Sequence, residues 1–230
     1  MFLLAALPIG CENPEEDSCN IKTPGIYVEF EATDTGSQVL AAAKFWTGNK
    51  PGGTSLFLGN CDKISVNGTE MREGGSGQNV YRATIGTADT YDFVFDRIDD
   101  GDTFNSTTTT PEAVTISALV SSDEIARDEA FDITWDTNGS GNINLIVEGD
   151  CIDDYPKING GNVSDTGSHT VNAGEITPKF QSDVDKTCTG SVTLTRQKDG
   201  TLDPALKGTI RGYAAGKTSF KSTPASTPAD

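Results

Sequence analysis

The sequence predicts an all-β protein that folds as two tandem antiparallel β-sandwich domains. Apolar and polar residues alternate with a period of two in many short segments, and turn-forming Gly, Asn and Pro residues separate these segments. The chain of 230 residues has room for two sandwiches of about 100 residues each. The clearest alternation covers residues 131–135 and 143–147, with a Gly- and Asn-rich loop between them. This stretch predicts a β-hairpin that carries Trp135 on its inner face.

The alternating segments fall into two groups. Residues 25–107 hold about seven short strands, and a Thr-rich run that ends at Pro111 predicts the joint to the second group. In the second group we expect further strands at 169–171, 191–195, 209–213 and 218–221. The predicted organisation is a signal segment at 1–10, an acidic tether at 11–23, sandwich domains at 24–108 and 109–221, and a disordered tail at 222–230.

The formal net charge of −17 makes some classes of binding partner unfavourable. Nucleic acid is not expected, because its binding depends on Lys and Arg side chains that neutralise phosphates. An anionic lipid surface would also repel the folded domains. Solubility is the simplest explanation of the acidity.

The N-terminus predicts a lipid anchor. Met1 to Ile9 form an apolar run that is too short to span a bilayer, and Gly10 directly precedes Cys11. This arrangement resembles the end of a bacterial lipoprotein signal, which implies that Cys11 is acylated as the new N-terminus. Pro8 and Ile9 depart from the residues usual at those positions, and no basic residue opens the segment. An ordinary secretory peptide and a buried N-terminal strand are the alternatives.

The remaining four cysteines suit two disulfides in an oxidising compartment, because none are spaced as close CxxC pairs. Three pairings are possible. If each bridge stays within one domain, the pairs are Cys19–Cys61 and Cys151–Cys188.

The lipoprotein-like start, the acidic tether and the paired sandwiches together resemble uncharacterised bacterial cell-envelope lipoproteins with immunoglobulin-like β-sandwich domains. The segment ITWDTNGSGNINLIVEGDC at 133–151 looks like a strand pair of such a domain. The resemblance implies a non-catalytic protein of the cell envelope, in the outer membrane or at the cell surface, held to the membrane through its acyl anchor. Its ligand would be an unknown protein or glycan. Both Cys151 and Cys188 follow Trp135, so an antibody-type topology, in which two cysteines bracket the tryptophan, is not expected.

Few residues suggest catalysis. His169 is the single histidine, and it precedes an apolar alternation in a way typical of a surface or edge strand. Carboxylates in acidic loops, such as Asp153, leave an envelope hydrolase or an accessory carbohydrate-binding module as alternatives. No cofactor is expected apart from calcium, which would make the protein a calcium-stiffened adhesin. The candidate calcium ligands, which could equally be solvated turn residues, are Asp99, Asp100 and Asp102 in the first domain and Asp150, Asp153 and Asp154 in the second.

An arginine that ends an apolar alternation and precedes an Asp-Gly turn occurs twice, at Arg97 and Arg196. Two explanations stay open, an internal duplication and a generic hairpin signal.

Overall fold

The computed structural model describes residues 15–74, 80–119, 123–137, 141–154 and 161–225. The described residues form 17 strands and three 3-10 helices of three residues each, so the all-β prediction is confirmed. The strands are β1 (Glu15–Asp17), β2 (Ile26–Asp34), β3 (Val39–Thr47), β4 (Ser55–Phe57), β5 (Asp62–Val66), β6 (Thr69–Glu70), β7 (Arg72–Glu73), β8 (Val80–Ile85), β9 (Tyr91–Arg97), β10 (Asp102–Thr108), β11 (Glu124–Ala126), β12 (Phe131–Thr134), β13 (Asn142–Gly149), β14 (Gly161–Ser164), β15 (Ser168–Val171), β16 (Cys188–Asp199) and β17 (Lys207–Thr223). The 3-10 helices are η1 (Ser18–Asn20), η2 (Thr23–Gly25) and η3 (Gln181–Asp183).

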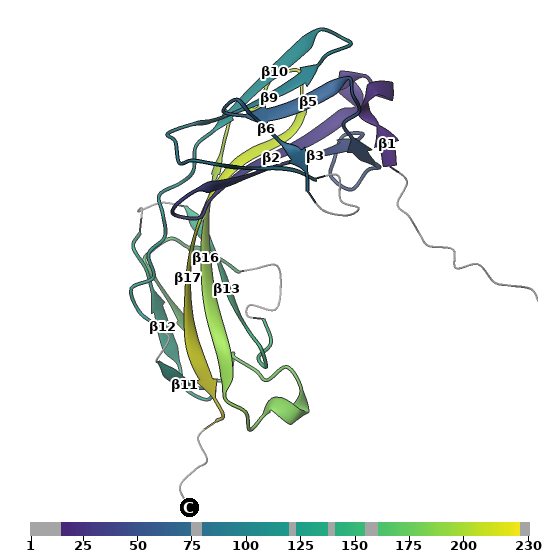
Figure 1. Cartoon of the computed structure of the whole chain (residues 1–230). Coiled ribbons are helices and arrows are strands. Elements are labelled where there is room, and N and C mark those ends of the chain that lie inside the picture. Colours follow the sequence, from purple (N-terminus) through teal and green to yellow (C-terminus); the bar gives the residue numbers. More distant parts are fainter. Residues whose placement is uncertain (1–14, 75–79, 120–122, 138–140, 155–160, 226–230) are drawn as a thin grey trace, which may run out of the picture.

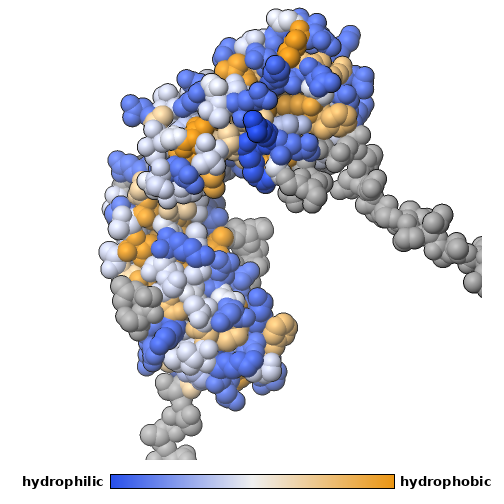
Figure 2. Space-filling view, viewed as in Figure 1, coloured by the Kyte–Doolittle hydropathy of each residue, from blue (hydrophilic) through white to orange (hydrophobic). Residues whose placement is uncertain are grey.

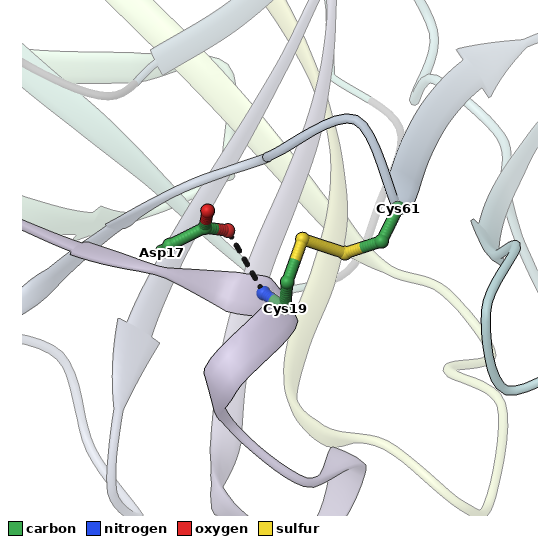
Figure 3. A group of neighbouring side chains, drawn as sticks. All are labelled: Asp17, Cys19 and Cys61. Atoms are coloured by element: carbon green, nitrogen blue, oxygen red, sulfur yellow. Dashed lines mark hydrogen bonds between the residues drawn. A yellow bond between two sulfur atoms is a disulfide. The ribbon is translucent and has the colours of Figure 1, made fainter.

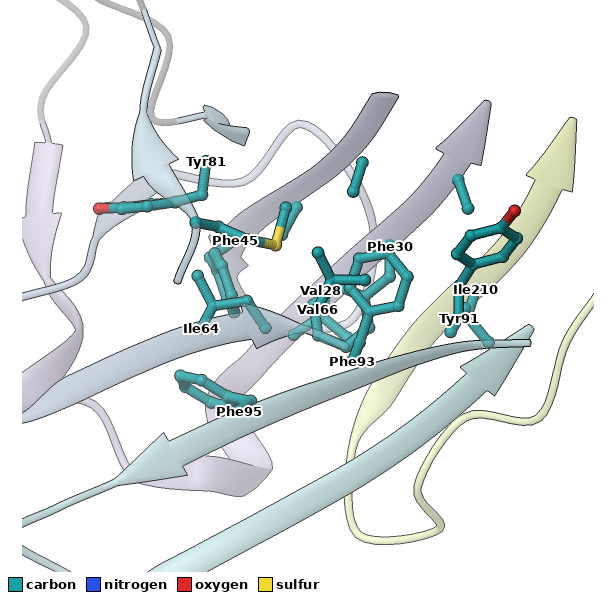
Figure 4. Close-up of a cluster of buried hydrophobic side chains, with 14 of the residues drawn as sticks. Val28, Phe30, Phe45, Ile64, Val66, Tyr81, Tyr91, Phe93, Phe95 and Ile210 are labelled. Atoms are coloured by element: carbon teal, nitrogen blue, oxygen red, sulfur yellow. The ribbon is translucent and has the colours of Figure 1, made fainter. Parts of the chain in front are cut away.

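Two hydrophobic cores divide the molecule into a first and a second body, which meet at an angle (Figure 1). In the first body the sheet of β10, β9, β5 and β6 packs on β2, β3, β8 and the first half of β17. Aromatic rings join the two layers: Phe30 stacks on Phe93 with ring centroids 5.2 Å apart, and Phe45 lies 5.1 Å from Phe95 (Figure 4). Each such pair contributes about 1 kcal/mol beyond its area burial.

The second body is also a sandwich. Strands β13, β14, β16 and the second half of β17 form one layer, and the antiparallel pair β12 and β15 forms the other. Their inner faces bury a core that includes Ile133, Trp135, Leu145, Leu194 and Phe220. Figure 2 shows the surface of both bodies as mostly hydrophilic, with hydrophobic residues in separate spots. Each body therefore closes over its own apolar layer, as expected of a sandwich.

The hairpin of β16 and β17 runs through both bodies. β17 has 17 residues, which corresponds to a length of about 55 Å. Its first half, from Lys207 to Ala214, pairs in parallel with β2, while its end, from Lys221 to Thr223, pairs in parallel with β11. Ile210 is buried in the first core and Phe220 in the second (Figure 4 shows Ile210). One strand thus completes both sandwiches.

This hairpin corrects the predicted segment boundaries. The strands expected at 209–213 and 218–221 are one strand, and residues 199–214, which we assigned to the second domain, belong to the first body. β17 also extends into the predicted tail, because Ser222 is buried and pairs with Cys188. The cause is that apolar alternation continues along β17 without a turn, so no end is marked. The rest of the predicted tail, 226–230, lies outside the described residues.

The N-terminal segment is likewise more ordered than the acidic tether we predicted. Glu15–Asp17 form β1, which pairs in parallel with β4, and Ser18 is fully buried. The disulfide at Cys19 draws these residues onto the first body despite their charge. The signal segment 1–10 and Cys11 lie outside the described residues.

The predicted hairpin at 131–147 is wrong. β12 pairs with β15, whereas β13 pairs with β14 and β16, so the two runs lie in opposite layers. Both alternations point their apolar residues into the same core, and a strand pair facing across that core has the same sequence pattern as a hairpin. The connection between the two strands crosses from one layer to the other.

The linker after β10 lies against β17 where that strand passes between the bodies. A Cβ atom at Gly212 would collide with the carbonyl oxygen of Thr109, and one at Gly216 with that of Val114. Glycine at these two positions therefore lets the linker backbone approach the strand closely.

Candidate functional site

Arg97 closes the inner face of β9, on the same side as the buried phenylalanines of that strand. Its Nε atom forms a buried ion pair with Asp62 at 3.2 Å. The other guanidinium nitrogens donate to the carbonyl oxygens of Ser18 at 3.2 Å and Ile21 at 2.6 Å. Arg97 therefore fixes the N-terminal segment to the first sandwich.

Burial raises the pKa of the Asp62 carboxyl above its ordinary value, and the nearby Ser18 hydroxyl and Arg97 guanidinium only partly oppose this effect. Within the described part of the chain, Oδ2 of Asp62 accepts no hydrogen bond of ordinary geometry. Asp62 is therefore a titratable group of the first body whose surroundings disfavour its charged form.

Arg127 plays the same part in the second body. Its buried guanidinium donates to the carbonyl oxygens of Asp183 at 3.1 Å, Val184 at 2.7 Å and Lys186, and to Sγ of Cys188 at 3.0 Å. Burial lowers the pKa of Arg127, and the nearby Asp183 and Asp185 carboxylates oppose that shift. Arg127 therefore holds this loop from inside through three of its carbonyl oxygens.

Arg196 lies where the two bodies meet. It forms a buried ion pair with Asp165 at 2.8 Å, and Asp165 also accepts a hydrogen bond from Nε1 of Trp135 at 2.8 Å. Arg196 further donates to the carbonyl oxygens of Ala113 at 2.9 Å and Asp136, which ties the linker to the second body. The hydrogen bond with Asp165 raises the pKa of Arg196, so the guanidinium stays protonated.

The surroundings of Arg97 and Arg196 differ between the two bodies. Cys61 directly precedes Asp62, which pairs with Arg97, whereas Cys151 follows the end of β13 that is remote from Arg196. The generic-hairpin explanation of the motif fits this arrangement better than duplication.

Both predicted disulfides are present, Cys19–Cys61 with Cα atoms 5.8 Å apart and Cys151–Cys188 with Cα atoms 5.5 Å apart. An aspartate lies beside each bridge. Asp17 accepts a hydrogen bond from the backbone N–H of Cys19 at 3.0 Å (Figure 3), and Asp150 lies against the second bridge. Because their sulfurs are bonded to each other, these cysteines cannot serve as thiolate metal ligands.

The six predicted calcium ligands lie in two separate turns, one in each body. Asp100 forms an ion pair with Arg97 at 3.4 Å, and Asp150 accepts a hydrogen bond from the N–H of Thr189 at 3.0 Å. Among the described residues, no three of these six carboxylates come within ligand distance of one another. The structure therefore does not bring the predicted ligands together, and calcium binding stays a prediction. His169 lies half-buried on β15, opposite Ile133.

A hollow of about 390 Å³ opens at the mouth of the first sandwich, beside Asp62. It forms where the chain crosses from β6 in one sheet to β7 at the edge of the other, with Met71 at the crossing. The Tyr81 hydroxyl in its floor accepts a hydrogen bond from the N–H of Leu58 at 2.6 Å. The apolar floor consists of Leu58, Ile64, Met71 and Tyr81, and the polar rim of Asn60, Lys63, Glu70, Arg72 and Glu73. We call this the sandwich-mouth hollow.

The sandwich-mouth hollow has the features of a binding site: an apolar floor, a few polar groups of both signs and a neighbouring carboxyl of shifted pKa. The sequence alone did not indicate it, because its residues come from two separate segments, 58–64 and 70–73, and from Tyr81 on β8. A second hollow of about 520 Å³ lies on the outer face of the second body and contains two predicted calcium ligands, Asp150 and Asp154. Within the described residues, no helix is long and apolar enough to cross a membrane.

No protein-family model and no curated protein matches the chain. Solved structures similar to it include the fibronectin(III)-like modules of Clostridium thermocellum CbhA, with 12% identity, coverage of 87% of this chain and 94% of that one, and a TM-score of 0.25. The tandem Ig repeats of Dlar show 13% identity, coverage of 81% and 98%, and a TM-score of 0.26. TM-scores this low do not support a fold assignment. The sandwich assignment rests on the strands and layers of the chain itself.

Proposed function

We propose that this protein is a non-catalytic, lipid-anchored component of the cell envelope that binds a protein or glycan ligand at the sandwich-mouth hollow. The observation that carries the proposal is the hollow itself, which combines an apolar floor with charged groups of both signs. Such a surface suits a ligand that has both apolar and polar faces.

The surroundings of the hollow favour binding, because its walls are held rigidly. The Cys19–Cys61 bridge and the Arg97–Asp62 pair lie directly behind it, so little order has to be gained when a ligand binds. Met71 supplies an adaptable apolar contact in the floor.

The anchor is tested by fractionation. Acyl chains on Cys11 would contribute about 0.8 kcal/mol per buried methylene, so Cys11→Ser should move the protein from the membrane fraction to the soluble fraction. Unchanged partitioning of that variant would exclude acyl anchoring at Cys11.

The binding site is tested by exchanging two rim charges. Glu70→Lys with Arg72→Glu keeps the net charge but reverses the pattern on the exposed rim, and should weaken binding to envelope proteins or glycans at least tenfold. The matched control exchanges the ion pair of the second body, Glu148→Lys with Lys217→Glu, whose atoms lie 3.4 Å apart. Equal binding by both exchanged variants would place the ligand elsewhere.

A further inference from the structure

The loop at the far end of the second body exposes two large apolar side chains. Among the described residues four large hydrophobic side chains are exposed, and Phe180, at 66%, and Val184 lie together in this loop. We call residues 177–187 the distal loop. Aromatic residues, phenylalanine among them, are enriched at the cores of protein interfaces.

Contacts with the rest of the second body hold the distal loop in place, so its apolar side chains have fixed positions on the surface. Arg127 binds its carbonyl oxygens from inside, and the Cys151–Cys188 bridge fixes its end. Lys179 N–H donates to the carbonyl oxygen of Cys151 at 3.0 Å. A surface that is already ordered loses little entropy when a partner covers Phe180.

A pocket of about 410 Å³ lies at the opposite end of the molecule, on the first body. Pro24, Phe104 and Ala205 supply its apolar lining, and Asp100, Asp102 and Lys22 line it as well. We call this the proximal pocket. Its volume is ample for one phenyl ring, and two carboxylates against one ammonium make its charged groups net acidic.

The distal loop and the proximal pocket lie at opposite ends of β17. Ala205 comes just before Lys207, where the strand begins, and Cys188 at the end of the loop pairs with Ser222, where the strand finishes. Because β17 is about 55 Å long, the loop cannot reach the pocket of its own chain. Any contact between the two must join different copies.

One exposed lysine of the distal loop complements the acidic groups of the proximal pocket. Lys179 directly precedes Phe180 and is exposed, and Lys186 lies in the same loop, where it pairs with Asp183 at 2.7 Å. Asp185 is the exposed acid of this loop. The two lysines and two aspartates give the distal loop no net charge on a chain of net charge −17, and Lys179, next to Phe180, is the cation that can face the acidic pocket of another copy.

We propose that the protein associates head to tail with second copies of itself, Phe180 of one chain entering the proximal pocket of the next and Lys179 facing Asp100 and Asp102. The contact joins two different surfaces, so it extends into linear chains rather than closing as a symmetric dimer. It involves neither Cys11 nor the sandwich-mouth hollow, and its test is independent of the proposed function.

The test is sedimentation velocity of the full chain over a range of concentrations. The wild type should form species that grow with concentration. Phe180→Ser in the loop and Ala205→Arg at the exposed pocket wall should each weaken association at least tenfold. Leu40→Ser, which changes an exposed apolar residue on β3, is the matched control and should leave association unchanged.

Mixing the two defective chains gives the decisive result. The Phe180→Ser chain keeps its pocket and the Ala205→Arg chain keeps its loop, so together they should form one-to-one dimers that grow no further. A wild type that stays monomeric at all concentrations overturns the proposal. So does association that survives Phe180→Ser, or a mixture in which no dimer forms although both variants keep the wild-type circular dichroism.

Discussion

Replacing Arg196 by glutamine should destabilise both bodies at once. The Arg196 and Asp165 side chains are only 3% and 1% exposed, and their closest atoms lie 2.8 Å apart. Glutamine cannot carry the positive charge, so the variant would bury the Asp165 carboxylate without its cationic partner. Removing one member of a buried ion pair costs about 4 kcal/mol.

That cost can be read as a shift in urea denaturation. With an m-value of about 2 kcal/mol per molar urea, a loss of about 4 kcal/mol lowers the midpoint by about 2 M. Arg211→Gln is the matched control on the neighbouring strand, because the Arg211–Asp199 pair has a similar separation of 3.3 Å but is 37% and 78% exposed. An exposed pair contributes less than about 1 kcal/mol, so the control midpoint should fall by less than about 0.5 M.

The two tryptophans allow each body to be followed separately. Trp46 lies on β3 in the first body and Trp135 in the core of the second, so Trp135→Phe and Trp46→Phe chains report the two bodies by fluorescence. Because β17 completes both cores, both probes should give one shared transition, and Arg196→Gln should move both. A shift confined to the Trp135 signal, or a shift no larger than that of Arg211→Gln, would refute the reasoning.

Three further changes test other parts of the structure. Burial raises the pKa of Asp62 in the folded chain, so the folded state binds this proton more tightly than the unfolded state does, and the wild type should lose stability relative to Asp62→Asn as the pH rises through the raised pKa. Urea midpoints of both chains, measured from pH about 3 to 7, give this difference in stability. A difference that grows in favour of the wild type as the pH rises would mean that the charged form is the stabilised one. Gly212→Val places a side chain against the linker backbone and should cost about 3 kcal/mol by urea denaturation, whereas an unchanged midpoint would show that the linker can move away. The double change Cys151→Ala with Cys188→Ala removes a disulfide of sequence separation 37 and should lower the free energy of unfolding by about 4 kcal/mol. Calorimetry should then show a melting temperature lower by about 10 °C, and a melting temperature within about a degree of the wild type would contradict this.

Strand positions and the two disulfides could be predicted from the sequence, because both depend on local patterns. Alternation located β2, β9 and β13, and the requirement that each bridge stay within one body selected the cysteine pairs. Pairing partners could not be predicted, because alternation fixes which residues face the core and not which strand lies beside them. The supposed hairpin at 131–147 failed for this reason.

Two buried arginines occupy inward-facing positions in the alternation of their strands. Arg97 continues the inward alternation of Phe93 and Phe95, and Arg196 continues that of Val192 and Leu194. Their positions in the period of two therefore indicated burial, although their residue type suggested the surface. The sandwich-mouth hollow left no such trace, because its lining comes from residues 58–64, residues 70–73 and Tyr81, which only the fold brings together.

The shared hairpin also determines how the chain must fold. A fragment that ends at residue 108 would lack Leu206 and Ile210 in its core and would leave the edge of β2 without its parallel partner. β2 pairs with a strand near the opposite end of the chain, and such distant pairing makes folding slow. The first body therefore cannot close until the C-terminal hairpin is available. The hydrogen-bonded ladder between β16 and β17 continues from one body into the other, so the hairpin connects the two bodies as well as completing both cores.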